Sequence, residues 1–273
     1  MARPFKLGIA LALLMLAGVV NAGSFVIGVA PHTSARVIVA QYQPLRLFLE
    51  RALGQPVEIV TAPDFTEYAR RAMHQAYDLA ITTGHQARML QADAGYHPLL
   101  TYLADFKAIV VVAGNSPARD AGDLKGGTVL GLSPTSLVTL WGMHWLRDEG
   151  GKDVTIRHVS AADSVAQLIL SGQAVAGFMS TANFSKLAPA TRARLKILME
   201  SEAMAGRVYV LNNRQAGRKA AIDQALWDFA ETAEGKAYFA ANALDGYRKL
   251  RARELDKMER YADEVRRVLR GGQ

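Results

Sequence analysis

The fold is decided by the stretch at residues 25–62, FVIGVAPHTSARVIVAQYQPLRLFLERALGQPVEIVTA. Its first six residues form an apolar run with β-branched side chains, which predicts a buried strand. A helix is expected after the polar turn that follows, with Pro44 near a helix start and Gly54 at the helix end. Residues 56–62 predict a second strand. The pattern is therefore a strand, a helix and a second strand.

The same alternation continues as far as Gly95. Asp64 is expected to cap a helix, because Glu67 follows at the spacing of a capping box. Residues 77–82 predict a third strand, and the turn at residues 83–85 leads into another helix. Strands that alternate with helices in this way predict a mainly parallel sheet with helices on both of its faces.

A second set of elements follows Gly95. Two adjacent strands are expected at residues 96–103 and 106–113. Further strands are expected at residues 128–132, 154–159, 174–179, 195–199 and 207–211, and helices at residues 120–124, from residues 133–136 to about Asp148, at residues 161–171 and over most of residues 219–273. The two sets predict an α/β protein of two lobes, joined by strands that cross near Lys107 and Arg207.

Three stretches of the chain make up the predicted lobes. Lobe 1 takes residues 24–106 and residues 207–273, which include the C-terminal helices, and lobe 2 takes residues 107–206. This is the layout of bilobal binding proteins. Their ligand cleft lies between the carboxyl ends of the two sets of strands.

The N-terminus has the three parts of a secretory signal. A short basic start is followed by an apolar run at residues 7–20 and by small residues up to Ala22. An uncleaved anchor or a buried helix is the alternative, but the apolar run has 14 residues, whereas a membrane span needs about 20. We therefore expect residues 1–23 to be a signal peptide, cleaved after Ala22 or Gly23. The product is expected in the periplasm.

Composition excludes several classes of protein. The chain has no cysteine, so disulfides, thiolate chemistry and a lipid anchor on cysteine are excluded. The net charge is +7, which could favour an anionic ligand, a membrane surface or nucleic acid. The C-terminal arginines alternate with acids, which is typical of a solvated helix face. A monomer that does not bind nucleic acid is expected.

Several short motifs follow one another along the chain. They are residues 25–31 with 43–50, 77–80, 115–117 with 123–126, 163–165, 234–237 and 245–247. Over about residues 25–269, their order and spacing resemble the phosphate/phosphite/phosphonate-binding proteins of ABC transporters. The resemblance implies a type 2 periplasmic-binding fold, hinge closure around a small anion, and delivery of that anion to a membrane permease.

The strongest candidate site is the loop from Ser133 to Ser136, between a predicted strand and a predicted helix. Hydroxyls and free backbone N–H groups at a helix N-terminus favour an anion. In the family that the chain resembles, a loop of this type holds phosphonate oxygens, and Thr135 and Ser136 match it. Pro134 removes one backbone donor. The alternative is that these residues simply cap the helix.

Other candidates follow the remaining predicted strands at the same edge. Gly84 would let the backbone approach a ligand closely, and His85 could donate to an anion, although an exposed histidine at a helix start is the alternative. The full set of predicted ligand residues is Ser133, Thr135, Ser136, Thr83, His85, Thr33, Ser34, Asp163, Ser164, Thr181 and Asn183.

Three positions depart from the family pattern. Aligned by eye, phosphonate-binding members have a histidine where this chain has Ala162, a carboxylate near Asn183 and a tyrosine at Thr83. The carboxylate suits the ammonium group of an aminophosphonate, so its loss argues against that ligand. The loop chemistry still favours a small oxyanion, while a ligand without phosphorus stays open.

Two other functions compete with transport. An enzyme is not expected, because the sequence lacks the Gly-x-Ser-x-Gly, His-Glu-x-x-His and phosphate-loop motifs, and its six histidines are dispersed. We therefore predict no catalytic residue, no metal site and no cofactor. The second alternative is a periplasmic sensing subunit that acts in trans on a membrane receptor or kinase, and the sequence does not separate it from a transport protein with an ABC permease as partner.

Overall fold

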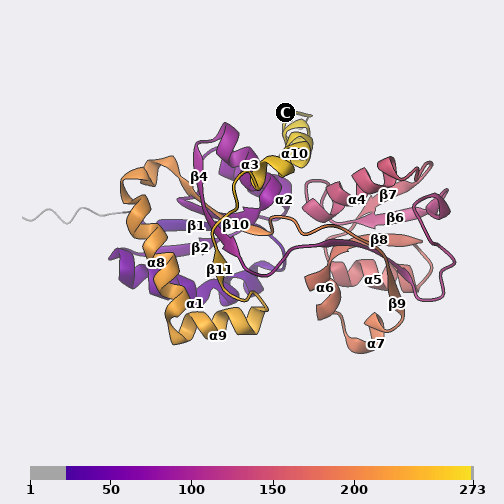
Figure 1. Ribbon diagram of the computed structural model, residues 1–273, viewed down its shortest axis with the longest axis horizontal. Coiled ribbons are helices and arrows are strands. Elements are labelled where there is room, and N and C mark those ends of the chain that lie inside the picture. Colours follow the sequence, from indigo (N-terminus) through magenta and orange to yellow (C-terminus); the bar gives the residue numbers. More distant parts are fainter. Residues whose placement is uncertain (1–22, 272–273) are drawn as a thin grey trace, which may run out of the picture.

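The computed structural model of the chain describes residues 23–271. The predicted signal peptide, apart from Gly23, lies outside the described residues. Figure 1 shows two lobes connected by two extended segments. Among the described helices, none is long and apolar enough to cross a bilayer.

The first lobe contains a sheet of six strands. In spatial order they are β11 (Tyr247–Arg248), β4 (Tyr96–Tyr102), β10 (Arg207–Asn212), β3 (Leu79–Thr83), β1 (Phe25–Val29) and β2 (Val57–Val60). β1 pairs in parallel with β2 and β3, whereas β10 pairs antiparallel with β3 and β4. The parallel pairing predicted from the first three strands is confirmed, and β10 and β11, which pair antiparallel with their neighbours, make the whole sheet mixed.

The second lobe has a sheet of five strands. Their order is β7 (Thr155–His158), β6 (Thr128–Gly131), β8 (Ala176–Ser180), β5 (Ala108–Ala113) and β9 (Leu195–Glu200). β6 pairs in parallel with β7 and β8, and β5 pairs antiparallel with β8 and β9. Both sheets thus combine a parallel half with an antiparallel half.

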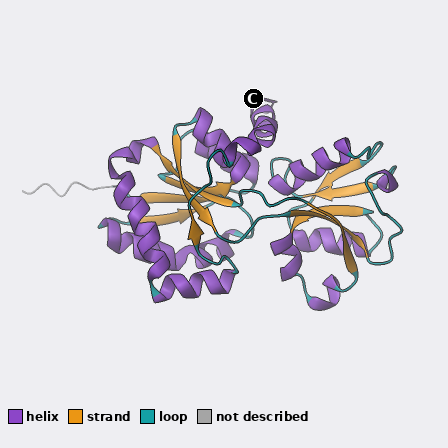
Figure 2. Ribbon diagram, viewed as in Figure 1, coloured by secondary structure: helices purple, strands orange, loops and turns teal. Residues whose placement is uncertain are grey.

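Helices cover both faces of each sheet (Figure 2). On the first sheet, α1 (Ala35–Leu53), α8 (Lys219–Glu231) and α9 (Ala233–Asn242) pack on one face, and α2 (Phe65–Met73), α3 (Gly84–Asp93) and α10 (Glu259–Gly271) pack on the other. On the second sheet, α4 (Leu137–Asp148) and α5 (Ala162–Leu170) pack on opposite faces, and the shorter elements are α6 (Thr181–Lys186), α7 (Pro189–Arg192), η1 (Gly122–Leu124), η2 (Asn213–Arg218) and η3 (Leu255–Met258).

The chain crosses between the lobes twice. It leaves β4 for β5 through residues 103–107 and returns from β9 to β10 through residues 201–206. The two segments touch each other at a bridge between Phe106 and Met204. Among residues 23–271, these two segments are the only chain connections between the two sheets, which is the arrangement expected of a hinge.

Pro44 lies inside α1 and not near a helix start, so that prediction was wrong. A proline inside a helix removes one backbone hydrogen bond. Here the cost is offset by packing, because α1 buries the side chains of Ile38, Tyr42, Leu45 and Leu49 completely. The predicted end of this helix is confirmed, since Gly54 adopts φ 65° after Leu53.

Two smaller predictions also differ from the structure. The helix expected at residues 120–124 is only the 3-10 turn η1, because the carboxylate of Asp120 accepts hydrogen bonds from the N–H groups of Gly122 and Asp123 and holds a tight turn. The strand β11 was not predicted. Its two residues are too few to show a periodic pattern.

Candidate anion site between the two lobes

The topology brings the predicted ligand loops to one edge of each sheet. β1, β2 and β3 run in the same direction, so the loops after them share an edge of the first sheet. The same holds for β6, β7 and β8 in the second sheet. Direct contact between the lobes occurs at Thr135, which touches Thr66 and His85.

Thr135 is fully buried at this contact. Its carbonyl oxygen lies 3.0 Å from Nε2 of His85, and its hydroxyl oxygen lies 3.1 Å from the hydroxyl oxygen of Thr66. Ser133 continues the chain of hydroxyls, with its Oγ 3.2 Å from Oγ1 of Thr135. The structure thus joins the predicted loop of the second lobe to His85 of the first.

His85 is buried and not the exposed helix-start histidine that was the alternative. Burial lowers its pKa to about 4, although the hydrogen bond to Thr135 opposes this. The imidazole is therefore neutral at pH 7. Because Nε2 must donate to the carbonyl oxygen of Thr135, Nδ1 carries no proton. Nδ1 has no hydrogen-bond partner in the part of the chain that the structure describes.

Three predicted ligand residues occupy N-cap positions without capping. Ser34 precedes α1, Thr83 precedes α3 and Ser136 precedes α4, yet none of these side chains accepts a hydrogen bond from its own helix. By contrast, Asp64 and Ser180 do cap their helices. Ser136 therefore does not cap α4. Its hydroxyl oxygen instead lies 2.8 Å from the hydroxyl oxygen of Thr139.

Uncapped helix ends matter because the first N–H groups of a helix have no intrahelical acceptor. They carry a partial positive charge and suit an anion. α3 and α4 begin beside the contact between His85 and Thr135, one in each lobe. The edge thus offers N–H groups and hydroxyls from both lobes.

Arg207 lies at the same edge and was missed as a site residue. As the first residue of β10, it pairs in register with Thr83 of β3. Nη1 of Arg207 and Oγ1 of Thr83 are both shielded from solvent, and neither has a hydrogen-bond partner among residues 23–271. Buried polar groups normally have a partner, so these two atoms mark a place for a ligand or water.

The side chains around Arg207 do not neutralise its charge. Burial lowers the pKa of Arg207, but Tyr42, which also forms a hydrogen bond with its side chain, Tyr102 and Tyr238 raise it above the usual value. Burial raises the pKa of Tyr102 and of Tyr238 well above the usual value, so both are neutral at pH 7. Within the described part of the chain, Arg207 forms no ion pair with a carboxylate.

The tyrosines near Arg207 belong to a buried network. The hydroxyl of Tyr102 lies 2.7 Å from that of Tyr209 and 2.6 Å from that of Tyr238, and it donates to Tyr42 at 3.4 Å. Tyr209 reaches Tyr247 at 3.0 Å. A network of hydroxyls bonded to one another holds its members rigidly.

His32 and Lys186 complete the surroundings of Arg207. His32 follows β1, and its Nδ1 lies 2.9 Å from the carbonyl oxygen of Ala30. Burial, then Arg207, and to a smaller extent Lys186 lower the pKa of His32 to about 3. Lys186, at the end of α6 in the other lobe, has its own pKa lowered by burial and by Arg207. Positive charge thus accumulates here from both lobes.

Other predicted residues form no side-chain hydrogen bond with the 133–136 loop in the part of the chain that the structure describes. Thr33, Ser34 and Asp163 are exposed, and Ser164, Thr181 and Asn183 are partly buried at the expected edge. The backbone N–H of Asn183 donates to the Ser180 hydroxyl, which caps α6. Their role as ligand residues stays a prediction.

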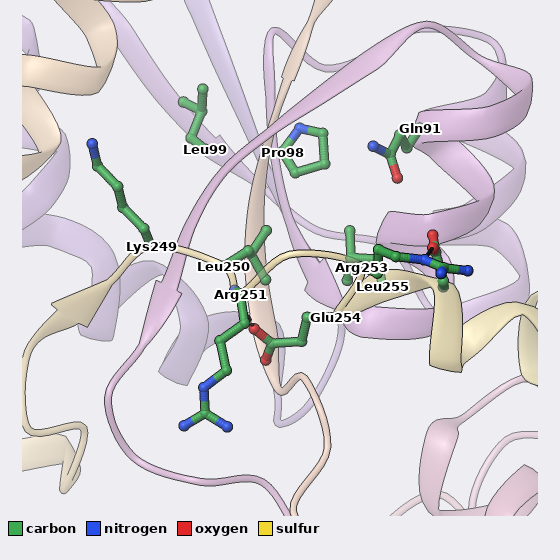
Figure 3. Close-up of a pocket in the computed structure, with 10 residues that line it drawn as sticks. Gln91, Pro98, Leu99, Lys249, Leu250, Arg251, Arg253, Glu254 and Leu255 are labelled. Atoms are coloured by element: carbon green, nitrogen blue, oxygen red, sulfur yellow. Dashed lines mark hydrogen bonds and ion pairs between the residues drawn. The ribbon is translucent and has the colours of Figure 1, made fainter.

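The described hollows of the surface lie elsewhere. One of about 400 Å³ is enclosed by α3, β4 and the segment before η3 (Figure 3). Its Glu254 already pairs with Arg248 and accepts from the N–H of Arg251. Another, of about 440 Å³, lies beside Trp227 and Phe239. Neither includes a predicted ligand residue. Among residues 23–271, no cluster of acids and histidines could hold a metal ion.

The two mixed α/β sheets and their two crossing segments define a bilobal periplasmic-binding-protein fold. A sequence model of one family, described as ABC transporter, phosphonate, periplasmic substrate-binding protein, matches residues 27–255. The chain therefore belongs to this family of periplasmic substrate-binding proteins. A comparison with curated proteins found no match.

Solved structures support the fold. XAC2383 from Xanthomonas citri, solved bound to ATP, has a TM-score of 0.77 at 18% identity, over 89% of this chain and 98% of its own. PhnD1 from Prochlorococcus marinus, in complex with methylphosphonate, has a TM-score of 0.77 at 14% identity, over 89% of this chain and 98% of its own. A binding protein component of an ABC phosphonate transporter from Pseudomonas aeruginosa has a TM-score of 0.70 at 15% identity, over 91% of this chain and 93% of its own. At these identities the likeness concerns the fold.

Sequence reasoning missed Thr66, His32, Lys186 and Arg207. Thr66 follows the second strand, so the rule that selected the other loops would have found it. His32 stands in a turn from which only Thr33 and Ser34 were chosen. Arg207 was considered only as a crossing point, since nothing local in the sequence shows that it lacks an acidic partner.

Proposed function

We propose that this protein captures a small oxyanion of the phosphate, phosphite or phosphonate class between its lobes and delivers it to the permease of an ABC importer. Membership of the family supports this role. The observation that carries it is the set of uncapped helix starts at Ser34, Thr83 and Ser136. Their hydroxyls and the N–H groups behind them suit the oxygens of an anion.

In this proposal, Thr135 and Ser136 bind the oxyanion from lobe 2. Thr83 and the backbone N–H of His85, at the start of α3, bind it from lobe 1, while the His85 imidazole donates to the carbonyl oxygen of Thr135 and holds the loop in place. Thr33, Ser34, Ser133, Asp163, Ser164, Thr181 and Asn183 complete the set of proposed ligand residues. Lobe 1 comprises residues 24–106 and 207–273, and lobe 2 comprises residues 107–206. Ligand binding involves no catalytic step.

Closure follows from contacts that join the lobes. The contacts of Thr135 with His85 and Thr66 exist only when the lobes are together. α10 adds a second link, because Nε of Arg260 donates to Nδ1 of His144 on α4 at 2.9 Å. An anion that touches both lobes favours the closed state by the difference between its affinities for the two states.

A thermal-shift screen of the purified protein tests the oxyanion. Phosphate, phosphite, methylphosphonate and sulfate are compared with unrelated metabolites. A ligand at about 100 times its Kd stabilises by roughly 2.7 kcal/mol. The double variant Thr135→Ala, Ser136→Ala should remove the shift, while Thr155→Ala, an exposed site at the opposite edge of the second sheet, should keep it. No shift with any oxyanion, or a shift unchanged in the double variant, contradicts the proposal.

Transport is tested separately from binding. Deletion of the gene should abolish uptake of the oxyanion that the screen identifies, and a plasmid copy should restore it. Uptake that continues unchanged would favour the alternative, a sensing subunit that acts in trans on a membrane receptor or kinase. In that case expression of ligand-responsive genes should be lost.

A further inference from the structure

The proposed oxyanion site, on which this inference rests, leaves one cluster without a role. This cationic cluster consists of Arg207 and Lys186, one from each lobe, and lies next to the oxyanion site. Neither residue pairs with a carboxylate of the described residues. By contrast, several other partly buried arginines are matched by acids. Arg266 pairs with Asp93, Glu259 and Asp263 at 2.6, 2.6 and 2.7 Å.

The guanidinium of Arg207 is confined to this edge by the sheet. Side chains alternate across a strand, so Arg207 shares the face of Tyr209, which packs with α1 and α9. Thr83 shares the face of Ile81, on the same side of the sheet. The shielded Nη1 of Arg207 and the shielded Oγ1 of Thr83 therefore lie on the same face of the paired strands β10 and β3, beside the tyrosine network.

Neutral hydroxyls cannot replace an anion beside a partly buried cation. Tyrosine hydroxyls supply lone pairs but no negative charge, and the pKa of Tyr209, like those of Tyr102 and Tyr238, is raised well above its usual value. Taking an unpaired charge out of water is costly unless an opposite charge meets it. Arginine also presents a planar fork of donors that matches the two oxygens of a carboxylate or phosphoryl group.

The cationic cluster adjoins the oxyanion site, and Thr83 lies between the two. Thr83 and His85 are two residues apart, and the N–H of Gly84 donates to the carbonyl oxygen of Ala205 at 3.2 Å. Residues 83–85 and 205–207 thus run side by side. His85 and the 133–136 loop lie at one end of this pair of segments, and Arg207 lies at the other. Two residues of extended chain span about 7 Å at most, which is the size of a small molecule.

We propose that the natural ligand carries two acidic groups, an oxyanion held at the 133–136 loop and a second carboxylate or phosphoryl group paired with Arg207 and Lys186. The ligand class is a small phosphonate, or a similar oxyanion, with an acidic substituent a few bonds away. A one-acid ligand leaves Arg207 unpaired.

Isothermal titration calorimetry of the purified protein tests this with four probes: methylphosphonate, 2-aminoethylphosphonate, phosphonoacetate and methylenediphosphonate. We expect phosphonoacetate or methylenediphosphonate to bind at least about 30-fold more tightly than methylphosphonate, as truncation of a buried charge pair implies. Whichever of the two binds more tightly identifies the second group. The aminophosphonate should bind weakest, because its ammonium group would face two cations.

Variants assign the preference to residues. Arg207→Met should reduce the affinity for the two-acid probe by a much larger factor than the affinity for methylphosphonate. Lys186→Met should act in the same direction and, being exposed, should not disturb folding. The double variant Thr135→Ala, Ser136→Ala should bind both probes more weakly.

Two results overturn the inference and keep the oxyanion function. One is that methylphosphonate binds as tightly as the two-acid probes, or more tightly. The other is that Arg207→Met weakens the binding of methylphosphonate and of the two-acid probe by the same factor. If none of the four probes binds but another metabolite does, the proposed function fails as well.

Discussion

Arg207→Met is expected to make the ligand-free protein more stable, although most substitutions destabilise. Methionine replaces the aliphatic stem of arginine and removes the guanidinium, whose Nη1 is shielded and has no partner among residues 23–271. Because no carboxylate pairs with it, its removal leaves no acid unpaired. A residue kept for ligand binding at a cost in stability is expected at such sites.

The size of the gain follows from the atoms involved. A buried donor without a partner costs about 1–3 kcal/mol, and more when it is charged. Part of the Arg207 side chain reaches solvent, so the penalty belongs at the lower end of that range. We expect the free energy of unfolding to rise by about 1–2 kcal/mol, which raises Tm by roughly 2–6 °C for a protein of this size.

Arg266→Met is the matched control. Arg266 has a side-chain exposure of only 17% and contacts three carboxylates of α3 and α10. Its removal leaves those acids without their partner and should cost about 1–3 kcal/mol. Urea unfolding of both variants without ligand gives the comparison. If Arg207→Met destabilises as much as Arg266→Met, the guanidinium of Arg207 is already satisfied in the free protein and our reasoning is refuted.

Three further outcomes follow from the described contacts. The pKa of His85 is about 4 in the folded state and 6.5 in the unfolded state, so the unfolded state binds more protons as pH falls. Between pH 7 and pH 5 this group should therefore lower the free energy of unfolding by about 2 kcal/mol. Urea unfolding of His85→Gln should show a smaller drop over the same pH range. Tyr102→Phe should cost about 1–3 kcal/mol in the same assay, because it leaves neighbouring buried hydroxyls without their partner; a neutral result would contradict the network. Arg260→Ala removes contacts to His144 and Asp148 between the lobes, so ligand affinity should fall a few-fold without any change at the site, and an unchanged Kd would show that α10 does not favour closure.

Much of the fold could be predicted because its signals are local. Strands near residues 25–29 and 108–113 are apolar runs, and the capping role of Asp64 follows from its spacing to Glu67 and is confirmed. Pro44 was misplaced because only tertiary packing of α1 tolerates it. β10 was predicted as a strand, but its antiparallel pairing depends on the return of the chain from the second lobe, which no local pattern encodes.

The candidate site divides in the same way. The 133–136 loop was visible as hydroxyls between a strand and a helix. That Ser136 does not cap α4 became visible only with the hydrogen bonds in view. Arg207 could not be chosen from the sequence, because what distinguishes it is the absence of an acidic neighbour in space. The sequence contains many acids and many bases, and it does not show which arginines will have a carboxylate next to them in the folded protein.

The charge of this site connects the family resemblance to the proposed ligand. Family members are expected to have a carboxylate near the position of Asn183, which suits an ammonium group. In this chain that carboxylate is missing, and Lys186 lies one turn further along α6. Burial is the largest cause of the lowered pKa of His32, and the charges of Arg207 and Lys186 lower it further. The sign of the local potential is therefore opposite to the one that an aminophosphonate requires. If Arg207 and Lys186 bind a second acidic group as we propose, the fold and the 133–136 loop are kept and the choice of ligand depends on a few side chains at the hinge edge.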